Sequence, residues 1–297
     1  MPFSPSETDA CRRLVAMALA EDLGDAGDVT SEMLIPHDLA GQAVFVARAE
    51  GVVAGLPAVE IVLATVRTPL LKLQPLVEDG TRVAPGDRLA VISGMMEFIL
   101  TAERTALNFL QRLSGVATLT RRYVDAVAGL PCQILDTRKT TPGWRLLEKY
   151  AVRCGGGHNH RMGLYDGFLV KDNHLAALGG GREAFTRLAL TVLPKLRTMA
   201  VPVEIEVDSL EQLNWALYCR PDGPDVILLD NMAPEQMREA VRIRNAGGAS
   251  RVQLEASGGV SLATVRAIAE SGVDRISVGA LTHSAPALDI ALDYVAS

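Results

Sequence analysis

The stretch Val-Pro-Val-Glu-Ile-Glu-Val-Asp-Ser-Leu-Glu-Gln-Leu-Asn-Trp-Ala-Leu, residues 201–217, decides the fold class. Its first half is a short apolar run suited to a buried strand, and its second half has the apolar spacing of a helix. The pattern repeats at once, because the apolar run 226–229 is followed by a helical segment that begins at Pro234. Strands that alternate with helices in this way need right-handed parallel crossovers, so the sequence predicts an α/β sheet or barrel.

The same alternation extends outward in both directions. Short apolar runs predict six strands, at 133–135, 168–170, 203–207, 226–229, 252–254 and 275–278. Helices are predicted among them at 143–153, 182–196, 209–217, 234–245 and 261–270. A full (β/α)8 barrel has more strands than this, so the sequence leaves closure of the barrel open.

The chain before residue 115 has a mixed pattern. A helical start is followed by strand-like segments at 42–53 and 71–77, a helix at 58–66, and turn-linked strands at 78–94. Apolar residues then recur at helical intervals from 97 to 127. We therefore predict one domain at residues 1–115 and an α/β domain at 116–280.

Composition and charge narrow the class of protein. The chain has 297 residues, of which 48% are hydrophobic, and its net charge is −6. An acidic chain is a poor binder of nucleic acid or anionic membranes, since both need clustered positive charge. No apolar run is long enough to span a membrane, and the apolar part of residues 12–20 is too short for a signal peptide. The four scattered cysteines favour reduced, buried thiols, so we expect a cytoplasmic location.

Polar residues follow all six predicted strands, and positive charge is concentrated among them. The window 138–174 holds seven Lys or Arg against three acids. Four of these cations lie at strand ends or in a glycine-rich loop and predict a site for a polyanionic ligand: Arg138, Lys139, Arg161 and Lys171. The other three are interpreted as the solvated face of a helix: Arg145, Lys149 and Arg153.

Acidic residues on the third and fourth strands predict different chemistry. Glu204, Glu206 and Asp208 alternate along one strand and so share a face. Together with Asp230 they could hold Mg²⁺, which prefers oxygen ligands. Alternatively, Asp208 caps the helix that begins at Ser209 and one glutamate pairs with a lysine. The spacing alone does not decide between the two interpretations.

Two glycine-containing loops predict a phosphate site, because each exposes backbone N–H groups at a late strand end. The first loop contains Ser257, Gly258 and Gly259, and the second contains Val278, Gly279 and Ala280. The run 154–157 is interpreted as a place where the backbone approaches a ligand closely. The chain lacks the Walker A, GxGxxG, HExxH and GxSxG motifs, which argues against the common kinase, dinucleotide-binding, zincin and hydrolase classes.

A series of motifs in fixed order covers nearly the whole chain. They lie at 21–30, 136–143, 148–152, 155–164, 171–174, 204–208, 228–231 and 278–284. Together they resemble the quinolinate phosphoribosyltransferase (decarboxylating) family, also called nicotinate-nucleotide pyrophosphorylase. The resemblance implies a pentosyltransferase of NAD biosynthesis, which joins quinolinate to phosphoribosyl pyrophosphate and releases pyrophosphate and CO₂. The implied fold is an N-terminal α/β sandwich, completed by the C-terminal tail at about 281–297, plus an incomplete, open α/β barrel with parallel strands.

The resemblance also implies roles for individual residues. Quinolinate carboxylates would be held by Arg138, His160, Arg161 and Lys171. Thr137 would contact substrate, Lys139 would meet pyrophosphate or the acid, and Glu204 and Asp230 would bind ribose hydroxyls and Mg²⁺. Of these, the implied catalytic residues are Lys139, Lys171, Glu204 and Asp230, and the two glycine-containing loops would hold the 5-phosphate. Arg104 matches an arginine that the family supplies from the neighbouring subunit, which implies a homodimer.

Three other functions are weighed against this one. A molybdenum-transport-associated relative shares the fold, but the intact motifs at 138–143 and 171–174 argue against it. A phosphate-binding barrel isomerase or aldolase would need a lone lysine or acid in its pocket rather than a cluster of cations. Residues 79–94 resemble the hairpins of lipoyl or biotinyl carriers, but the lysine that such carriers present is missing from the tip at Gly94-Met95-Met96-Glu97.

Overall fold

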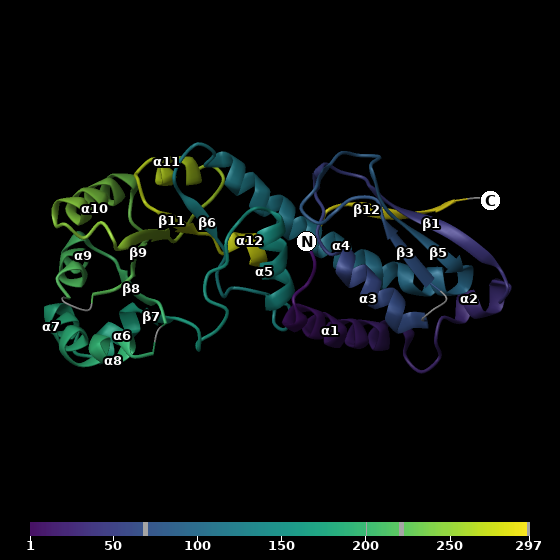
Figure 1. The fold of residues 1–297 in the computed structure, drawn as a ribbon, viewed down its shortest axis with the longest axis horizontal. Helices are drawn as coiled ribbons and strands as arrows, with labels where there is room; N and C mark the ends of the chain where they lie inside the picture. Colours follow the sequence, from purple (N-terminus) through teal and green to yellow (C-terminus); the bar gives the residue numbers. More distant parts are fainter. Residues whose placement is uncertain (68–70, 200, 220–222, 296–297) are drawn as a thin grey trace. The chain divides into compact units, whose positions relative to one another are not determined.

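The computed structural model of the chain describes residues 1–67, 71–199, 201–219 and 223–295 (Figure 1). Contacts divide the chain into two compact units. The first contains Met1–Arg121, Lys139–Gly157 and Leu281–Ser297, and the second contains Arg122–Arg138 and His158–Ala280. The first unit thus extends beyond residue 115 and includes a later segment, 139–157; the domain limits drawn from the sequence stay a prediction. The last two residues of the predicted tail, Ala296 and Ser297, lie outside the described residues.

The first unit is built on a four-stranded antiparallel sheet with the order β12-β1-β5-β3. Its strands are β1 (Ala40–Ala47), β3 (Leu71–Pro75), β5 (Arg88–Met95) and β12 (Ile290–Val295). A small second sheet pairs β2 (Gly51–Val52) with β4 (Arg82–Val83). The strand β12 pairs with β1 along its whole length and forms the edge of this sheet, so the C-terminal segment is part of it.

Helices complete the first unit. They are α1 (Pro5–Leu23), α2 (Val29–Leu34), α3 (Leu56–Arg67), α4 (Met96–Ala126), α5 (Arg145–Cys154) and α12 (Ala280–His283), the last three of which supply residues discussed below. The helix α1 starts where Ser4 and Glu7 form a capping box, with the Ser4 hydroxyl accepting from the Glu7 N–H and the Glu7 carboxylate accepting from the Ser4 N–H. The strand predicted at 42–53 is interrupted, because the Ala47 N–H donates to Asp87 O and the chain turns before Gly51.

The helix α5 corrects one sequence interpretation. Lys149, taken for part of a solvated face, is fully buried, as are its neighbours Glu148 and Tyr150. Arg153 is half-buried and its Nη2 lies 2.7 Å from the Glu7 Oε1. Arg145 is also half-buried, and its Nε donates to Thr140 Oγ1 at 3.1 Å. The helix is therefore packed on several sides, which the charge pattern of its sequence does not reveal.

The second unit is an open barrel of six parallel strands with the order β6-β11-β10-β9-β8-β7. They are β6 (Gln133–Leu135), β7 (Phe168–Val170), β8 (Val203–Val207), β9 (Val226–Asp230), β10 (Gln253–Ser257) and β11 (Arg275–Ser277). Strands β7 to β11 are neighbours in chain order, and β6 closes onto β11 instead of β7. The ring is thus left open between β6 and β7, which confirms the predicted incomplete barrel.

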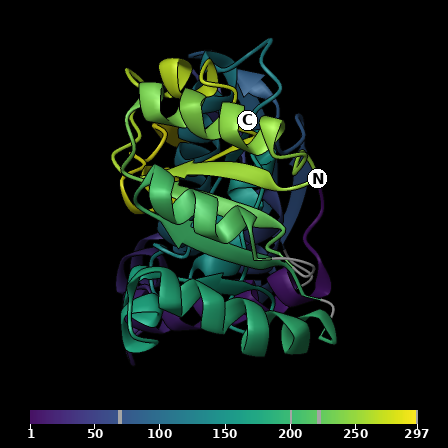
Figure 2. The same cartoon turned by 90° about the vertical axis from the view of Figure 1, so that its left-hand side faces the viewer.

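Helices cover the outside of these strands, and Figure 2 shows α9 (Leu210–Leu217) and α10 (Pro234–Ala246) side by side. The helix predicted at 182–196 forms as α7 (Gly181–Arg187), the π-helix η1 (Leu188–Val192) and α8 (Leu193–Arg197), after a short α6 (Asp172–Ala177). The last predicted helix is reduced to α11 (Val265–Ala269). Buried aliphatic side chains fill the space between helices and strands, among them Leu213, Ile227, Ala240, Leu254 and Ile268.

Two expectations from composition can be checked. The four cysteines are free, and three of them are buried while Cys132 is half-buried. Among the described residues, the structure has no helix with the length and hydropathy of a membrane span.

Candidate active site

The parallel register brings charged residues of different strands into contact. Glu255 of β10 is paired in register with Arg275 of β11 on one side, and Ser257 at the end of β10 is paired with Asp230 at the end of β9. Glu204 lies on β8, in register with Val226 of β9. Residues that are far apart in sequence thus become neighbours within the barrel: Ser257 and Asp230 at the carboxyl ends of their strands, and Glu204, Glu255 and Arg275 farther back along theirs.

His160 is the centre of a buried charged cluster in the second unit. Its Nε2 lies 3.0 Å from Glu204 Oε2 and 3.4 Å from Glu255 Oε1, and Arg275 Nε lies 2.9 Å from Glu255 Oε2. Glu255 is fully buried and Glu204 is 5% exposed. Two buried carboxylates are costly without compensating charge. The imidazole and the guanidinium supply that compensation.

The environment fixes the proton on Nε2 of His160. Burial lowers the pKa of this imidazole, but the hydrogen bonds and charges of Glu204 and Glu255 outweigh burial and raise the pKa to about 9. The Arg161 N–H donates to Nδ1 at 2.7 Å and favours the neutral ring. The two carboxylates favour a proton on both ring nitrogens, whereas the Arg161 N–H favours an unprotonated Nδ1. Both allow a proton on Nε2, so Nε2 donates toward Glu204 whether the ring is neutral or charged. Burial, together with the charge of Glu255, raises the pKa of Glu204.

Asp136, at the end of β6, holds the loop that carries His160. Its buried carboxylate accepts from the His160 N–H at 2.9 Å and from Asn159 Nδ2 at 2.6 Å. The Asp136 N–H donates in turn to His158 O. Asp136 therefore fixes the conformation of the loop 158–160, and its carboxylate is occupied by the loop's own donors.

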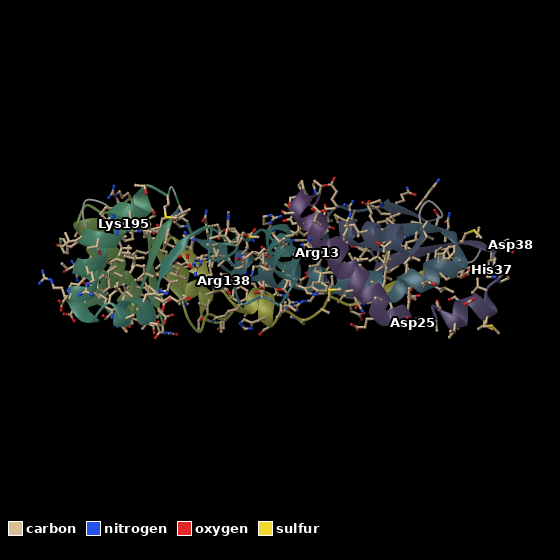
Figure 3. All side chains as sticks on the ribbon, turned by 90° about the horizontal axis from the view of Figure 1, so that it is seen from below. Arg13, Asp25, His37, Asp38, Arg138 and Lys195 are labelled. Atoms are coloured by element: carbon tan, nitrogen blue, oxygen red, sulfur yellow. The ribbon has the colours of Figure 1, made fainter. Side chains whose placement is uncertain are left out.

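Two arginines of the second unit, Arg138 and Arg161, are near enough for their charges to interact, and the charge of Glu204 also acts on Arg161. Burial and the positive charge of Arg138 lower the pKa of Arg161, whose Nη1 donates to Gly167 O at 3.0 Å. Arg138, marked in Figure 3, is half-buried, and its Nε is buried without a hydrogen-bond partner in the described part of the chain. Two guanidinium groups whose charges influence each other, one of them with an unsatisfied buried donor, are suited to bind a carboxylate or phosphate.

Lys171, Glu206 and Asp208 bear on the second interpretation of the acidic strand, in which one glutamate pairs with a lysine and Asp208 caps a helix. Lys171, directly after β7, is exposed, and its Nζ lies 3.3 Å from Glu206 Oε2. One glutamate of the strand is therefore paired with a lysine, as the second interpretation held. The cap of α9 is Ser209, whose hydroxyl accepts from the Gln212 N–H at 3.4 Å, and not Asp208, which is exposed.

The first glycine-containing loop has a backbone that only glycine fits. Gly258 has a φ of +94°, and a Cβ on it would lie 2.2 Å from Asn231 Oδ1. Asn231 itself has a φ of +53°; its N–H donates to Ser257 O and its Nδ2 donates to Asp230 Oδ2. Gly259 is exposed, and Gly279 and Ala280 after β11 are half-buried. Val278 is buried and its N–H donates to Leu135 O.

Most predicted site residues belong to the second unit, and Thr137 is half-buried there between Asp136 and Arg138. Two predicted residues belong to the first unit. Arg104 is exposed on α4, and Lys139 is exposed at the start of the segment Lys139–Gly157. Among the described residues, the group whose atoms could hold a metal ion is His160, Glu204 and Glu255, and Asp230 is not part of it.

The sequence prediction missed Glu255 and Arg275 as site residues. The fifth strand was predicted to end at 254, so Glu255 was placed in the following loop, whereas β10 runs to Ser257. The available signal was the same as for Glu204: a charged residue inside an otherwise apolar strand must find a partner within the barrel.

Comparison with known proteins agrees with this geometry over nearly the whole length. Residues 28–114 match the family model "Quinolinate phosphoribosyl transferase, N-terminal domain", and residues 116–293 match its C-terminal counterpart. The chain belongs to the quinolinate phosphoribosyltransferase family.

Individual relatives and structures of the family cover the chain almost end to end. The nicotinate-nucleotide pyrophosphorylase [carboxylating] of Mycobacterium leprae is 44% identical over 98% of this chain and 99% of its own. The quinolinate phosphoribosyltransferase [decarboxylating] 1b of Nicotiana tabacum is 41% identical, over 94% of this chain and 81% of its own. The structure of the nicotinate-nucleotide pyrophosphorylase from Francisella tularensis superposes with a TM-score of 0.87, at 38% identity, over 97% of both chains.

Proposed function

We propose that this enzyme transfers the phosphoribosyl group of phosphoribosyl pyrophosphate to the nitrogen of quinolinate and removes one carboxylate. The products are nicotinate mononucleotide, pyrophosphate and CO₂, a step of de novo NAD synthesis. The observation that carries the proposal is the Arg138–Arg161 pair, with its unsatisfied buried Nε, beside the buried acids of β8 and β10. A planar dicarboxylic acid supplies the oxygens that such a pair of guanidiniums lacks.

Arg138, Arg161 and Lys171 hold the two carboxylates of quinolinate in this proposal. Lys171 is exposed, and the Glu206 side chain that it contacts is only 14% exposed. Because an ammonium group has three donors, a substrate carboxylate can accept from Lys171 while Glu206 keeps its own contact. The predicted contact of His160 with quinolinate requires its Nε2 to exchange Glu204 for the substrate, since both ring nitrogens have partners in this structure.

The residues present fit a Mg²⁺ ion bound together with phosphoribosyl pyrophosphate. Glu204 Oε1 is a buried carboxylate oxygen without a hydrogen-bond partner among the described residues, and Mg²⁺ prefers such oxygen ligands. Glu204 would hold the ion. Asp230, the other ligand that the resemblance implies, lies four residues beyond Val226, the register partner of Glu204, and outside the group of atoms that could share one ion in this structure, so it would meet the ion through the bound substrate. When bound, the ion stabilises negative charge on the departing pyrophosphate.

The protein's own groups stabilise charge at both ends of the reaction. The N–H groups of Ser257, Gly258, Gly259, Gly279 and Ala280 hold the 5-phosphate, while Lys139 meets pyrophosphate or the acid. The Val278 N–H already donates to Leu135 O, so Val278 contributes to this loop without donating to the phosphate. Glu204 and Asp230 bind the ribose hydroxyls, and Thr137 contacts substrate. When CO₂ leaves, its electron pair stays on the ring carbon and is stabilised by the neighbouring pyridinium nitrogen; that carbon then takes up a proton from solvent. Arg138 and Lys171 position the departing carboxylate, and no base is required.

The assembly and location are part of the same proposal. Arg104 is exposed on α4, which agrees with a homodimer in which each protomer supplies this arginine to the site of its partner. Free cysteines and an acidic net charge agree with a cytoplasmic enzyme that binds neither membranes nor nucleic acid.

The test is release of CO₂ by the purified protein given quinolinate, phosphoribosyl pyrophosphate and Mg²⁺, with nicotinate in a parallel reaction. We expect turnover of quinolinate alone. A folded protein that is silent with quinolinate would contradict the proposal and favour the molybdenum-transport-associated relative.

A further inference from the structure

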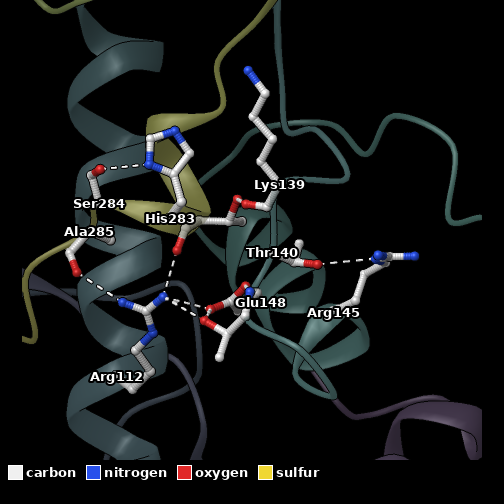
Figure 4. A network of polar contacts seen from close by, with 10 residues as sticks. Arg112, Lys139, Thr140, Arg145, Glu148, His283, Ser284 and Ala285 are labelled. Carbon is white, nitrogen blue, oxygen red and sulfur yellow. Dashed lines mark hydrogen bonds and ion pairs between the residues drawn. The ribbon is translucent and has the colours of Figure 1, made fainter.

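A buried polar network in the first unit fixes the segment that follows Lys139 (Figure 4). Glu148 of α5 is fully buried; its Oε1 accepts from Arg112 Nη2 at 2.6 Å and from Thr141 Oγ1 at 2.8 Å. Its Oε2 accepts from the Thr141 N–H at 3.0 Å. A buried carboxylate with three donors holds its surroundings in one geometry, because breaking any contact leaves a desolvated charge short of a partner.

The same arginine connects this segment to α12. Arg112 Nη1 donates to Ala285 O at 2.9 Å and its Nη2 donates to Thr282 O at 2.5 Å. Thr282 is fully buried, and its hydroxyl donates to Lys139 O at 2.8 Å. The backbone is therefore held at Lys139 by Thr282 and two residues later, at Thr141, by Glu148.

The two anchors leave the Lys139 side chain outside the network. Lys139 is exposed, and in Figure 4 its side chain extends away from Arg112 and Glu148. Holding the two peptide groups that directly follow Lys139 restricts the backbone from which its side chain extends, and therefore the positions that its ammonium group samples. Such restriction matters where the ammonium must meet an anion at a defined place.

We propose that Thr282 is a positioning residue for Lys139, acting through the hydrogen bond from its hydroxyl to the Lys139 carbonyl, with the Arg112–Glu148 pair holding Thr282 and Thr141 in place. The inference rests on the proposed function, in which Lys139 meets an anionic group of the substrates. Thr282 itself contacts no reacting atom in this role.

The test is a double-mutant cycle between Thr282 and Lys139 in the full-length enzyme. Thr282→Val keeps the shape of the side chain and removes the donor, and Lys139→Met removes the ammonium. We expect Thr282→Val to lower kcat/KM about five- to tenfold, the effect of one lost hydrogen bond. On the Lys139→Met background, Thr282→Val should lower kcat/KM by less than about twofold. The ammonium group through which Thr282 affects activity is then already absent.

Two further variants separate positioning from loss of structure. Thr282→Ser keeps the hydroxyl and should recover most of the lost kcat/KM. Thr120→Val is a matched control, since Thr120 is also fully buried and its hydroxyl donates to a carbonyl, Val116 O, at 2.8 Å. It should leave the kinetic constants within about twofold while changing stability by a similar amount. If Thr282→Val does not fold, Thr282→Ala enters the cycle in its place.

The outcomes are distinguishable from failure of the proposed function. An active wild-type enzyme in which Thr282→Val costs equally with and without Lys139 would overturn the inference and leave the function intact. An inactive wild-type protein would overturn both, because Lys139 would then have no substrate group to meet.

Discussion

Lys171 and Glu206 illustrate how a single ion pair can be read at the residue scale. The contact of 3.3 Å joins an exposed lysine to a largely covered glutamate, so Lys171 is the member of the pair that a ligand can reach. We predict that Lys171→Ala lowers kcat about 10- to 100-fold, since a charged hydrogen bond to the departing carboxylate is lost. Steady-state kinetics of CO₂ release would measure this change.

The matched control for that prediction is Lys195→Ala. Lys195 is an exposed lysine of α8 in the same unit, labelled in Figure 3, and its removal should leave kcat unchanged. If Lys171→Ala raised KM for quinolinate and kept full turnover, its role would be uniform binding instead of positioning for decarboxylation.

A second residue-scale prediction concerns pH and the start of α1. Burial raises the pKa of Glu7, but hydrogen bonds from Ser4 and the contact with Arg153 outweigh burial and lower it below its usual value. A lowered folded-state pKa stabilises the protein above the unfolded-state pKa of about 4.3, and this contribution is lost as pH falls through the folded value.

Glu7→Gln should therefore reduce the free energy of unfolding by about 1–2 kcal/mol at pH 7. The difference from wild type should shrink as pH falls below about 4, where the wild-type carboxylate is itself protonated. Thermal unfolding of both proteins across this range would measure it. A difference that stays constant with pH would show that the charge of Glu7 does not matter.

At the scale of the element, the turn after β10 depends on one glycine. Gly258→Ala places a Cβ 2.2 Å from Asn231 Oδ1 at a φ of +94°. We expect the loop to shift and the KM for phosphoribosyl pyrophosphate to rise about tenfold or more, because the backbone N–H groups lose alignment with the phosphate.

Gly272→Ala is the control for backbone strain alone. Gly272 has a similar φ of +89°, and the nearest atom to its added Cβ is Val241 Cγ1, at 3.5 Å. This variant should lose only the stability that the positive φ costs, without the clash at Gly258, and should keep its KM. Equal KM values for the two variants would remove the phosphate-loop assignment of Gly258.

The sequence predicts the strands and helices of the barrel better than it predicts individual contacts. The periods of the apolar runs located all six barrel strands, because a buried parallel strand must be apolar for several residues whatever surrounds it. Burial of Lys149 and the contact of Glu255 with His160 could not be read from the chain, since both depend on which distant residues lie opposite. For the same reason the Arg112–Glu148 network was invisible, although the motif at 148–152 that contains Glu148 was recognised.

On the scale of the whole molecule, the sharing of Arg104 between protomers can be decided by mixing two defective variants. If each active site combines its own Lys171 with the partner's Arg104, both Arg104→Ala and Lys171→Ala are impaired as homodimers. A mixed dimer then has one site with neither residue and one site with both. Random exchange makes half of the dimers mixed, so about a quarter of wild-type activity should return in an isologous dimer.

Activity should be measured after unfolding and refolding the variants together, with separately refolded variants mixed afterwards as the control. Activity that stays at the mean of the two variants would place Arg104 in the site of its own chain.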